Sequence, residues 1–483
     1  MNTSRRNSFL VTTSVILVIL CSPPAQAQIE TQKLVLSTPV SEAWLGYAVS
    51  ITNDITVGQA RSGSDGTITV FRRSGTTWAE EAVLFVPDTG ITGIEHSTIA
   101  NTGNIIIAGA PGHPLERGKA HIFRYTGSAW LPEQVLTGPT RGFFGDATGA
   151  SGNVVVVGDW LYNSGTMAAT GSAFVYRYDS TLGIWQSETQ LLASDVESAA
   201  IFGFSLSSSG DRILVGSPYK DAAGTNSGAA YIFEYDNILN VWNQTARLVA
   251  SDASPGADFG WGVSLFNDIA VIGAPGAGSG AAYVYRKSGS VWSEEAVLAP
   301  SLLETLSFFG NSVSVSNNNI VIGAPFDGST GSAFLFRYDG SSWPQIAKLA
   351  PSDGAADDRF GYEVFLSGDV ALIGAPYHDD GAFNSGAAYV FSGLVGSDCN
   401  DNGIPDADDI SSGFSADANG NSVPDECETA RGDFNLDGMV NVTDLLSLLG
   451  VWGPCPGCPQ DTNVDSKVNV TDLLTVLGNW GPI

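Results

Sequence analysis

The chain has 483 residues, of which 43% are hydrophobic, only 15% are charged and 57 are glycine. This composition is typical of a β-rich globular protein with a large core, and it excludes an intrinsically disordered chain. The formal net charge of −29 argues against nucleic acid as a partner, because nucleic-acid binding normally needs basic patches, and it favours cations.

The first residues have the features of a secretory signal. Arg5 and Arg6 precede an apolar run from Phe9 to Leu20, and Ala25-Gln26-Ala27 supplies the small residues of a cleavage site. We therefore predict a signal peptide over residues 1–27, cleaved after Ala27. Since the apolar run is too short to cross a bilayer, we expect no membrane span and a protein that is secreted or held at the cell surface.

Most of the chain, from about residue 29 to residue 393, repeats one unit. Its clearest copy, Phe308 to Asp353, has an alternating run SVSVS and the β-branched or aromatic runs IVI and AFLF between Asn, Gly and Ser clusters, so it predicts four short strands. Seven copies start about fifty to sixty residues apart, the period expected of four-stranded propeller blades. The copies begin at Leu45-Gly46, near Glu95-His96 in a degenerate form, and at Phe144-Gly145, Phe202-Gly203, Phe259-Gly260, Phe309-Gly310 and Phe360-Gly361.

A second motif follows the FG start in three copies: VIGAP at 271–275, VIGAP at 321–325 and LIGAP at 372–376. With these motifs the repeats resemble the FG-GAP repeat of integrin alpha-subunit propellers and of many exported bacterial proteins. The resemblance implies an all-β seven-bladed β-propeller, which we assign to residues 28–396. The glycines permit close backbone approach or a positive φ, and the Pro ends the second strand because it has no N–H. A Trp marks the fourth strand at Trp78, Trp130, Trp185, Trp242, Trp292 and Trp343.

The seventh copy stops at Phe391-Ser392-Gly393, before its fourth strand. The missing strand is found at the front of the chain, where Thr31–Ser37 resembles fourth-strand endings such as Ala246–Ser251. A strand from residues 29–38 in the last blade would close the ring and remove two exposed sheet edges. We therefore predict closure by the N-terminal strand.

The repeats carry no pattern of catalytic residues such as HExxH, GxSxG or a phosphate loop. Because the four histidines fall at unrelated repeat positions, we expect them at the surface or in loops, and we predict that the protein is not an enzyme. Integrin blades often hold calcium between their first two strands, but that turn is short here and calcium is not implied there. The histidines are His96, His113, His121 and His378.

The loops after the GAP position are the candidate ligand contacts of the propeller. Pro218–Asp221 and Pro376–Asp380 each place an aromatic residue beside charged ones on one face of the ring. The alternative is that these are ordinary solvated loops.

After Gly396 the composition changes to Asp, Asn, Gly and Cys, and residues 397–430 form a separate linker. Oxygen-bearing residues recur twice at offsets 1, 3, 5, 9 and 12, the pattern a calcium loop needs to surround one ion. The pair resembles thrombospondin type 3 repeats; the alternative is an acidic flexible linker. The first set is Asp398, Asn400, Asn402, Asp406 and Asp409, and the second is Asp417, Asn419, Asn421, Asp425 and Glu428.

Residues 431–483 duplicate a calcium loop that leads into an amphipathic helix. Ligands are expected at loop positions 1, 3, 5, 7, 9 and 12. This pattern resembles a type I dockerin, a small α-helical domain with paired EF-hand-like loops, and implies binding to a cohesin-like protein. Ser466 replaces the glycine found at Gly438 and could weaken the second site. The first ligand set is Asp433, Asn435, Asp437, Met439 (backbone), Asn441 and Asp444; the second is Asp461, Asn463, Asp465, Lys467 (backbone), Asn469 and Asp472.

The dockerin resemblance also implies the residues that contact the partner. They are Val442-Thr443 and Val470-Thr471, identical in both halves, so the module could dock in either orientation. The alternative is that they only begin the helices. We expect most of the apolar surface of the two helices to pack between them. These apolar residues are Leu445, Leu446, Leu448 and Leu449, with Leu473, Leu474, Val476 and Leu477.

Four cysteines remain after removal of the predicted signal, all in the acidic tail. An even number in an exported protein favours two disulfides. Three pairings are possible, of which we favour Cys399 with Cys427 and Cys455 with Cys458.

The sequence thus predicts an exported, non-enzymatic binding, adhesion or scaffold protein. The propeller would bind an unidentified protein or polysaccharide, and the tail, with calcium as its cofactor, would attach the chain to a cohesin-like partner. One alternative is a propeller-based extracellular hydrolase or lyase that acts on polysaccharide and is anchored by the tail. Another is a purely structural surface or matrix component.

Overall fold

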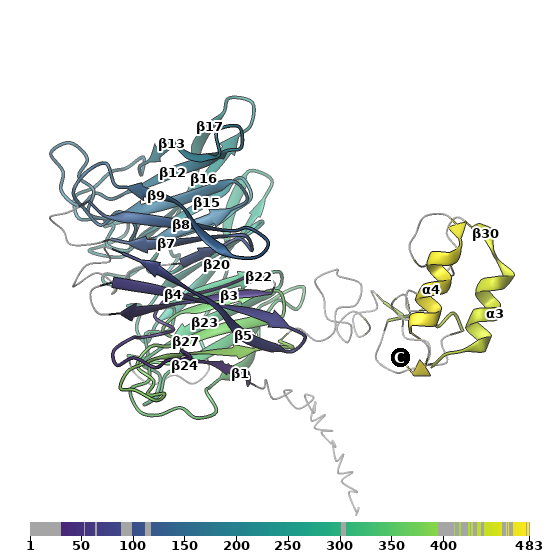
Figure 1. The fold of residues 1–483 in the computed structure, drawn as a ribbon. Coiled ribbons are helices and arrows are strands. Elements are labelled where there is room, and N and C mark those ends of the chain that lie inside the picture. Colours follow the sequence, from purple (N-terminus) through teal and green to yellow (C-terminus); the bar gives the residue numbers. More distant parts are fainter. Residues whose placement is uncertain are drawn as a thin grey trace, which may run out of the picture.

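The structure is a computed structural model. It describes residues 30–52, 54–62, 65–87, 99–111, 117–300 and 306–394, and in the tail residues 410, 415–416, 424–425, 427, 432–435, 439–455, 460, 462, 467–479 and 481–482. Within the propeller the strands form seven four-stranded antiparallel sheets arranged as the blades of a ring (Figure 1). The seven repeats are therefore confirmed as seven blades, including the degenerate second copy, whose start near Glu95-His96 lies outside the described residues.

Each of blades 1 to 6 consists of four strands consecutive in sequence, and blade 7 takes its outer strand from the start of the chain. The strands are, for blade 1, β2 (Val49–Thr52), β3 (Ile55–Ser62), β4 (Asp65–Ser74) and β5 (Thr77–Val86); for blade 2, β6 (Ile99–Asn101), β7 (Ile105–Ala110), β8 (Lys119–Tyr125) and β9 (Trp130–Thr137); for blade 3, β10 (Thr148–Ser151), β11 (Val154–Asp159), β12 (Ser172–Asp179) and β13 (Ile184–Leu191); for blade 4, β14 (Ser205–Ser209), β15 (Arg212–Ser217), β16 (Ala229–Asp236) and β17 (Val241–Leu248); for blade 5, β18 (Val263–Phe266), β19 (Ile269–Ala274), β20 (Ala281–Ser288) and β21 (Val291–Leu298); for blade 6, β22 (Val313–Ser316), β23 (Asn319–Ala324), β24 (Ser332–Arg337) and β25 (Gln345–Leu349); and for blade 7, β26 (Val364–Ser367), β27 (Val370–Ala375), β28 (Ala387–Phe391) and β1 (Glu30–Leu34).

The second strand of a blade is largely apolar because neighbouring blades cover both of its faces. All six residues of β19 are buried, whereas the outer strand β17 alternates between exposed and partly buried residues. This difference follows the number of covered faces: a strand covered on both sides has no solvent face for polar side chains. Five of the six predicted Trp residues lie in outer strands, and Trp343 precedes β25.

The FG and GAP glycines pack against each other across the seam between blades. Gly310 adopts a φ of +92°, and a Cβ built on Gly273 would lie 2.0 Å from the carbonyl oxygen of Gly310. Only glycine allows this approach at either position. The expectation that these glycines serve close backbone packing is confirmed.

The N-terminal strand closes the ring as predicted. β1 pairs antiparallel with β28, and Lys33 lies opposite Tyr389. The Gln32 side chain also bonds the backbone of Trp78 in blade 1, accepting from its N–H and donating to its carbonyl, both at 2.7 Å. Gln134 of blade 2 makes the same two bonds to Trp185 of blade 3, at 2.8 and 2.9 Å. β1 therefore joins blade 7 to blade 1 in the way that an ordinary outer strand joins its neighbour.

The described part of the tail includes the short helices α3 (Val442–Gly450) and α4 (Val470–Gly478), each started by a capping box. Two small antiparallel pairs connect the halves: β29 (Met439–Val440) pairs with β32 (Gly481–Pro482), and β30 (Gly453–Pro454) pairs with β31 (Lys467–Val468). The segment that follows the helix of each half thus pairs with the loop strand of the other half. Among the described residues, no helix is long and apolar enough to cross a membrane.

The helix packing of the tail differs from the prediction. Leu448 and Val476 are buried together with Val440 and Val468, and Leu445 and Leu473 are partly buried. The other four predicted core residues are exposed, because a nine-residue helix covers only its inner face with so small a partner. They are Leu446, Leu449, Leu474 and Leu477.

One histidine contradicts its predicted surface or loop placement, since His121 lies in β8 and is only 5% exposed. His378 lies in a loop, as predicted, but is also 5% exposed. A carboxylate explains the second case, since Nδ1 of His378 lies 2.9 Å from Oδ2 of Asp358. His96 and His113 lie outside the described residues.

Candidate functional site

A cleft with a volume of about 830 Å³ opens where blades 6, 7 and 1 meet. Blade 1 contributes Trp44 and Tyr47 from the segment before β2, and blade 7 contributes Tyr362 from the segment before β26. The loops after the second strands supply Phe326 of blade 6, and Tyr377 and Phe383 of blade 7. Charged and amide groups complete the lining with Asp357, Asp358, Arg359, Asp379 and Asn384.

Backbone hydrogen bonds hold the two sides of this cleft together. The N–H groups of Trp44 and Leu45 donate to the carbonyls of Asn384 and Ser385, at 3.1 and 3.0 Å. Trp44 has a φ of +55°, which turns the chain from this contact into the first blade. The position of the Trp44 ring therefore depends on the blade 7 loop that it meets.

The aromatic rings of the cleft contact one another across the blade junction. The ring centroids of Tyr47 and Tyr362 are 4.5 Å apart, and the Tyr362 hydroxyl donates to that of Tyr47 at 2.5 Å. Trp44 meets Tyr377 edge-on at 6.1 Å. Phe326 carries the guanidinium of Arg359 4.2 Å from its ring centroid.

The charges of the cleft are partnered within it. Arg359 forms an ion pair with Asp357 at 3.2 Å, and Asp358 faces His378. Asp379 accepts a hydrogen bond from the N–H of Asn384 at 2.6 Å. The cleft thus combines open aromatic faces with polar groups that already have ion-pair or hydrogen-bond partners, and its three carboxylates outnumber its one guanidinium.

Beneath the cleft, a polar network ties the closing strand to blade 7. The ammonium of Lys33 donates to Asp353 at 2.8 Å and also to Asp380. The Tyr389 hydroxyl donates to Asp353 at 2.9 Å. Burial opposes ionisation of Asp353, but the bonds from Lys33 and Tyr389 outweigh it and lower the pKa of this carboxyl. The loop that carries Tyr377 is therefore fixed from below by β1.

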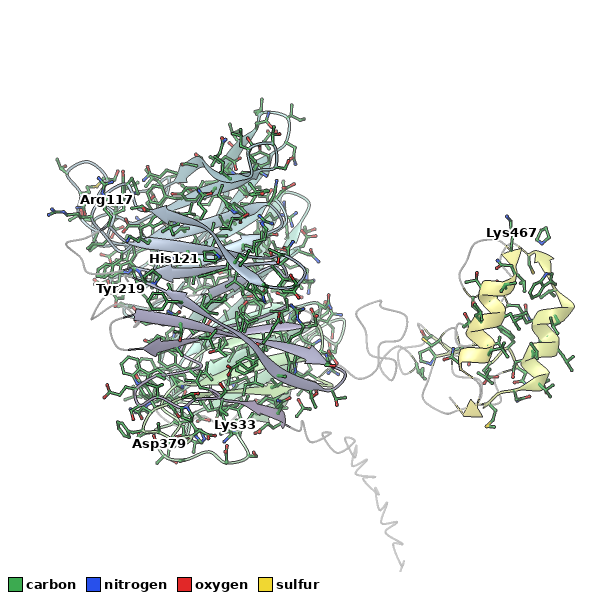
Figure 2. The ribbon with its side chains drawn as sticks, viewed as in Figure 1. Lys33, Arg117, His121, Tyr219, Asp379 and Lys467 are labelled. Carbon is green, nitrogen blue, oxygen red and sulfur yellow. The ribbon has the colours of Figure 1, made fainter. Side chains whose placement is uncertain are left out.

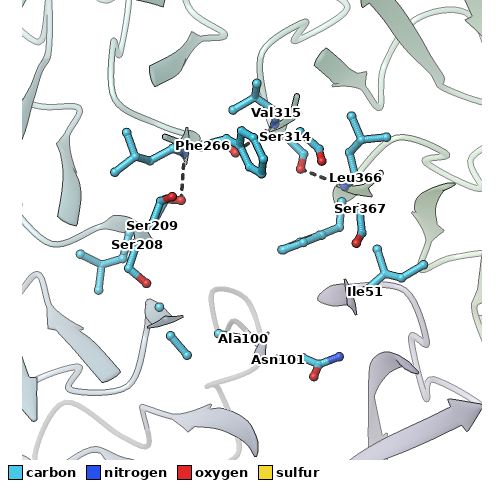
Figure 3. Close-up of a pocket in the computed structure, with 18 of the residues that line it drawn as sticks. Ile51, Ala100, Asn101, Ser208, Ser209, Phe266, Ser314, Val315, Leu366 and Ser367 are labelled. Carbon is cyan, nitrogen blue, oxygen red and sulfur yellow. Dashed lines mark hydrogen bonds between the residues drawn. The ribbon is translucent and has the colours of Figure 1, made fainter. Parts of the chain in front are cut away.

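The central channel, about 310 Å³ in volume, is lined by the innermost strands of the blades. Its serines bond from blade to blade: Ser264 accepts from the N–H of Val315 at 3.0 Å, and Ser314 accepts from that of Leu366 at 2.9 Å (Figure 3). These bonds satisfy backbone donors at the inner sheet edges, which have no strand beside them. The hydroxyls of Ser264 and Ser314 are therefore used for structure.

Four of the described acids of the propeller have raised pKa values. Burial raises the pKa of Asp258, in the segment before β18, to about 6. Burial raises the pKa of Glu363, which lies at the channel mouth, to about 8. In blade 3, burial raises the pKa of Asp159 to about 6 and that of Asp146 well above its usual range. Asp146 and Asp159 are 2% and 0% exposed, and neither lines the cleft or the channel. Their position in the interior gives no route for a substrate.

The loops predicted to contact a ligand have different surroundings. Tyr377 and Asp379 line the cleft, whereas Tyr219 is 37% exposed and lies in blade 4. Tyr219 and Asp379 lie along the same side of the propeller (Figure 2), as the prediction that both loops share one face requires. Sequence reasoning missed Trp44, Tyr47 and Tyr362; aromatic residues next to the FG position of a copy were the available signal.

In the tail, the structure describes some of the predicted calcium ligands. Asp433 and Asp444 are both 0% exposed, and Asp444 accepts from the N–H groups of Phe434 and Asn441, each at 2.9 Å. Asn441 accepts from the N–H of Thr443 at 2.8 Å and so caps α3. Two buried carboxylates in one small loop are costly without a cation, so these residues fit the predicted calcium site.

The second loop repeats this arrangement. Asp472 is 0% exposed and accepts from the N–H groups of Thr462 and Asn469, at 2.8 and 2.9 Å. Lys467 lies in β31. The predicted ligands Asp437, Asp461, Asn463 and Asp465 lie outside the described residues, as do all the linker ligands except Asp425. Cys399 and Cys458 also lie outside them, so the cysteine pairing stays a prediction.

The four predicted partner contacts are all exposed at the first turns of the helices. Val442 and Val470 are 57% and 59% exposed. Each begins a row of exposed apolar residues at helical spacing: Val442, Leu446 and Leu449 on α3, and Val470, Leu474 and Leu477 on α4. We call these two sets the helix rows. The exposed leucines were not predicted, although their spacing from the valines was visible in the sequence.

Comparison with known proteins agrees with the repeat structure. The FG-GAP repeat family model matches residues 185–233, 242–285, 292–336 and 343–391. Each match begins at the outer strand of one blade and ends in the third strand of the next. No curated protein matches the chain.

Two solved structures show distant similarity. A protein from Lactobacillus plantarum has a TM-score of 0.45 at 12% identity, over 64% of this chain and 86% of that protein. Saccharomyces cerevisiae Sqt1 has a TM-score of 0.41 at 10% identity, over 72% of this chain and 96% of Sqt1. Neither is close enough to indicate function. The repeat matches and the sheet topology together identify the chain as one that carries FG-GAP repeats folded into a seven-bladed β-propeller.

Proposed function

We propose that this protein is an exported, non-enzymatic binding protein, whose propeller holds a ligand while its dockerin-like tail attaches to a cohesin-like partner in a calcium-dependent manner. FG-GAP repeats in a propeller suggest a binding or scaffold module, and the aromatic cleft offers a site for a ligand. The export signal, the calcium dependence and the nature of the partner come from the sequence motifs.

One observation carries the proposal for the tail: the helix rows are matched. Val442, Leu446 and Leu449 are 57, 63 and 49% exposed, and Val470, Leu474 and Leu477 are 59, 61 and 49% exposed. Six exposed apolar side chains in so small a module favour a partner that covers them. Because the two rows are equivalent, either can face the partner.

Calcium would act by fixing the loops that start the helices. The described residues that would hold it are Asp433, Asn435, Asn441, Asp444 and the backbone of Met439 in the first loop, and Asn469 and Asp472 with the backbone of Lys467 in the second. A bound cation neutralises carboxylates that otherwise repel one another. The start of each helix, with Thr443 or Thr471, then has a defined direction.

The test is capture of a cohesin by the full chain in calcium. Replacing Thr443 alone by Arg should leave capture largely intact, because the second row still docks. Replacing Thr443 and Thr471 together by Arg should abolish it. Ile238→Glu, at an 89% exposed position of a propeller hairpin, is the matched control and should have no effect. Loss of capture in the single variant, or capture by the double variant, would contradict docking through either row.

The main alternative is a polysaccharide-directed hydrolase or lyase. Its acids would have to lie in the cleft, where Asp357, Asp358 and Asp379 are engaged by Arg359, His378 and Asn384. The most perturbed acid pair, Asp146 and Asp159, is enclosed in blade 3. These positions favour binding over catalysis.

A further inference from the structure

We infer that the cleft between blades 6, 7 and 1 binds a neutral polysaccharide chain. This inference rests on the proposed binding role of the propeller and gives it a ligand class. It draws on three properties of the cleft: its aromatic faces, its polar groups and its charge balance.

The aromatic side chains provide flat apolar faces at an open site. Phe383 is 61% exposed and Phe326 is 39% exposed, and Trp44 and Tyr377 line the wall between them. Large aromatic side chains that are exposed to water in a group are more typical of a binding site than of the rest of a protein surface. A pyranose ring has an apolar C–H face of matching size, and stacking it on such a side chain removes apolar surface from water.

The polar groups between the rings suit hydroxyl groups of a ligand. The hydroxyls of Tyr47 and Tyr362 meet within the cleft, and carboxylate and amide groups of Asp357, Asp379 and Asn384 stand around it. Hydroxyl and carboxylate oxygens have lone pairs beyond the bonds they already make, so each can take a further hydrogen bond. A ligand that alternates apolar faces with many hydroxyls uses both kinds of group at once.

The charge of the cleft argues against an acidic ligand. Its lining has three carboxylates, of Asp357, Asp358 and Asp379, and one guanidinium, of Arg359. An acidic polysaccharide would also approach a chain with a net charge of −29 and would be repelled. A neutral chain does not meet this repulsion, and comparison with a basic peptide tests whether the carboxylates select a cation instead.

The size of the cleft indicates several sugar units rather than one. Its volume of about 830 Å³ is near the upper end of the range for small-molecule pockets. Tyr47 and Tyr362 also line the channel mouth, a second hollow of about 150 Å³. The binding surface therefore continues beyond the cleft, as a chain requires.

The test is titration of the full chain with soluble neutral glucan, mannan and xylan oligosaccharides, followed by calorimetry and Trp fluorescence. We expect binding to at least one of them and none to polygalacturonate. Tyr377→Ala and Phe383→Ala should each weaken the affinity about tenfold, the factor expected from about 1.4 kcal/mol of lost ring contact. Ile238→Ala, at an exposed hairpin position of blade 4 that does not line the cleft, serves as the control without effect.

The outcomes separate this inference from the proposed function. Absence of binding to all the neutral oligosaccharides, preference for polygalacturonate or for a basic peptide, or equal binding by the Tyr377 and Phe383 variants would overturn the ligand class and leave the binding role standing. Release of reducing ends from a bound oligosaccharide would overturn the non-enzymatic role and leave the ligand class in place.

Discussion

The propeller and the tail are both built from repeated units, and in both a strand from a distant segment of the chain completes the structure. In the propeller, β1 supplies the outer strand of blade 7. In the tail, β30 and β32 each pair with the loop strand of the other half. The two regions differ in what remains uncovered: blade strands such as β19 are buried completely, whereas half of the eight predicted core residues of the tail are exposed.

This difference indicates where each region obtains its stability. The propeller covers its apolar strands with its own blades, so ring closure is the contact on which it depends most. Among its described residues, the tail buries only a small core around Leu448 and Val476, and it buries the carboxylates of Asp433 and Asp444 in the first loop and of Asp472 in the second. We expect it to depend on an ion for its fold and on a partner to cover its surface.

The largest effect should follow removal of the closing strand. Deletion up to Pro39 removes the β1 ladder, the buried Leu34 side chain, the Lys33 network and the Gln32 bonds to Trp78. We expect the thermal midpoint of the propeller to fall by about ten degrees or more, since several contacts each of about 1 kcal/mol or more are lost together. Calorimetry would measure this. Deletion of residues 431–483 is the control, and an unchanged midpoint in the N-terminal deletion would show that closure contributes little.

Calcium removal should affect the tail and spare the propeller. The predicted ligands all lie after residue 397, and their carboxylates repel one another without the ion. Chelation should therefore remove the helical component of the circular dichroism spectrum, which comes from α3 and α4, and leave the β component. Simultaneous loss of the helical and β signals would mean that the fold of the propeller also depends on calcium.

A smaller effect is expected from the acid at the channel mouth. Burial raises the pKa of Glu363 from the usual 4.5 to about 8, so the folded state holds a proton that the unfolded state releases at lower pH. The contribution of Glu363 to stability therefore decreases as the pH rises from about 4.5 to about 8 and is constant above that. Glu363→Gln should raise the thermal midpoint at pH 8 by a few degrees and change it little at pH 4. A gain of the same size at both pH values would exclude this ionisation as the cause.

The repeat architecture could be predicted from sequence because it depends on local patterns. The FG and GAP glycines and the apolar second strands recur from copy to copy. The missing fourth strand after Gly393 is visible as a departure from this repeat. The cleft could not be predicted in the same way. Phe326 and Tyr377 follow the GAP motif at the same position of neighbouring copies, but Trp44 lies before the FG position of the first copy, and only ring closure brings blade 1 beside blade 7.

Which residues of a short element are buried could also not be predicted from the sequence. The spacing of Leu446 and Leu474 fits a packed helix as well as an exposed row, and the choice depends on how much surface the other half of the tail can cover. His378 is buried because Asp358 lies opposite it, and these residues come from separate segments of blade 7. Such outcomes depend on tertiary partners that periodicity does not specify.

The pairing of β1 with β28 has a consequence for biosynthesis. The hydrogen bond from Thr31 to Val390 spans 359 residues. During synthesis β1 is therefore made first and can pair only after β28, the last strand of the propeller, has been made. Contacts this distant in sequence form slowly. Until then the nascent ring is open and β28 presents an unpaired edge. At high concentration this edge can accept the Glu30–Leu34 segment of a second molecule. Refolding of the denatured chain should therefore produce interlocked dimers in a proportion that rises with protein concentration.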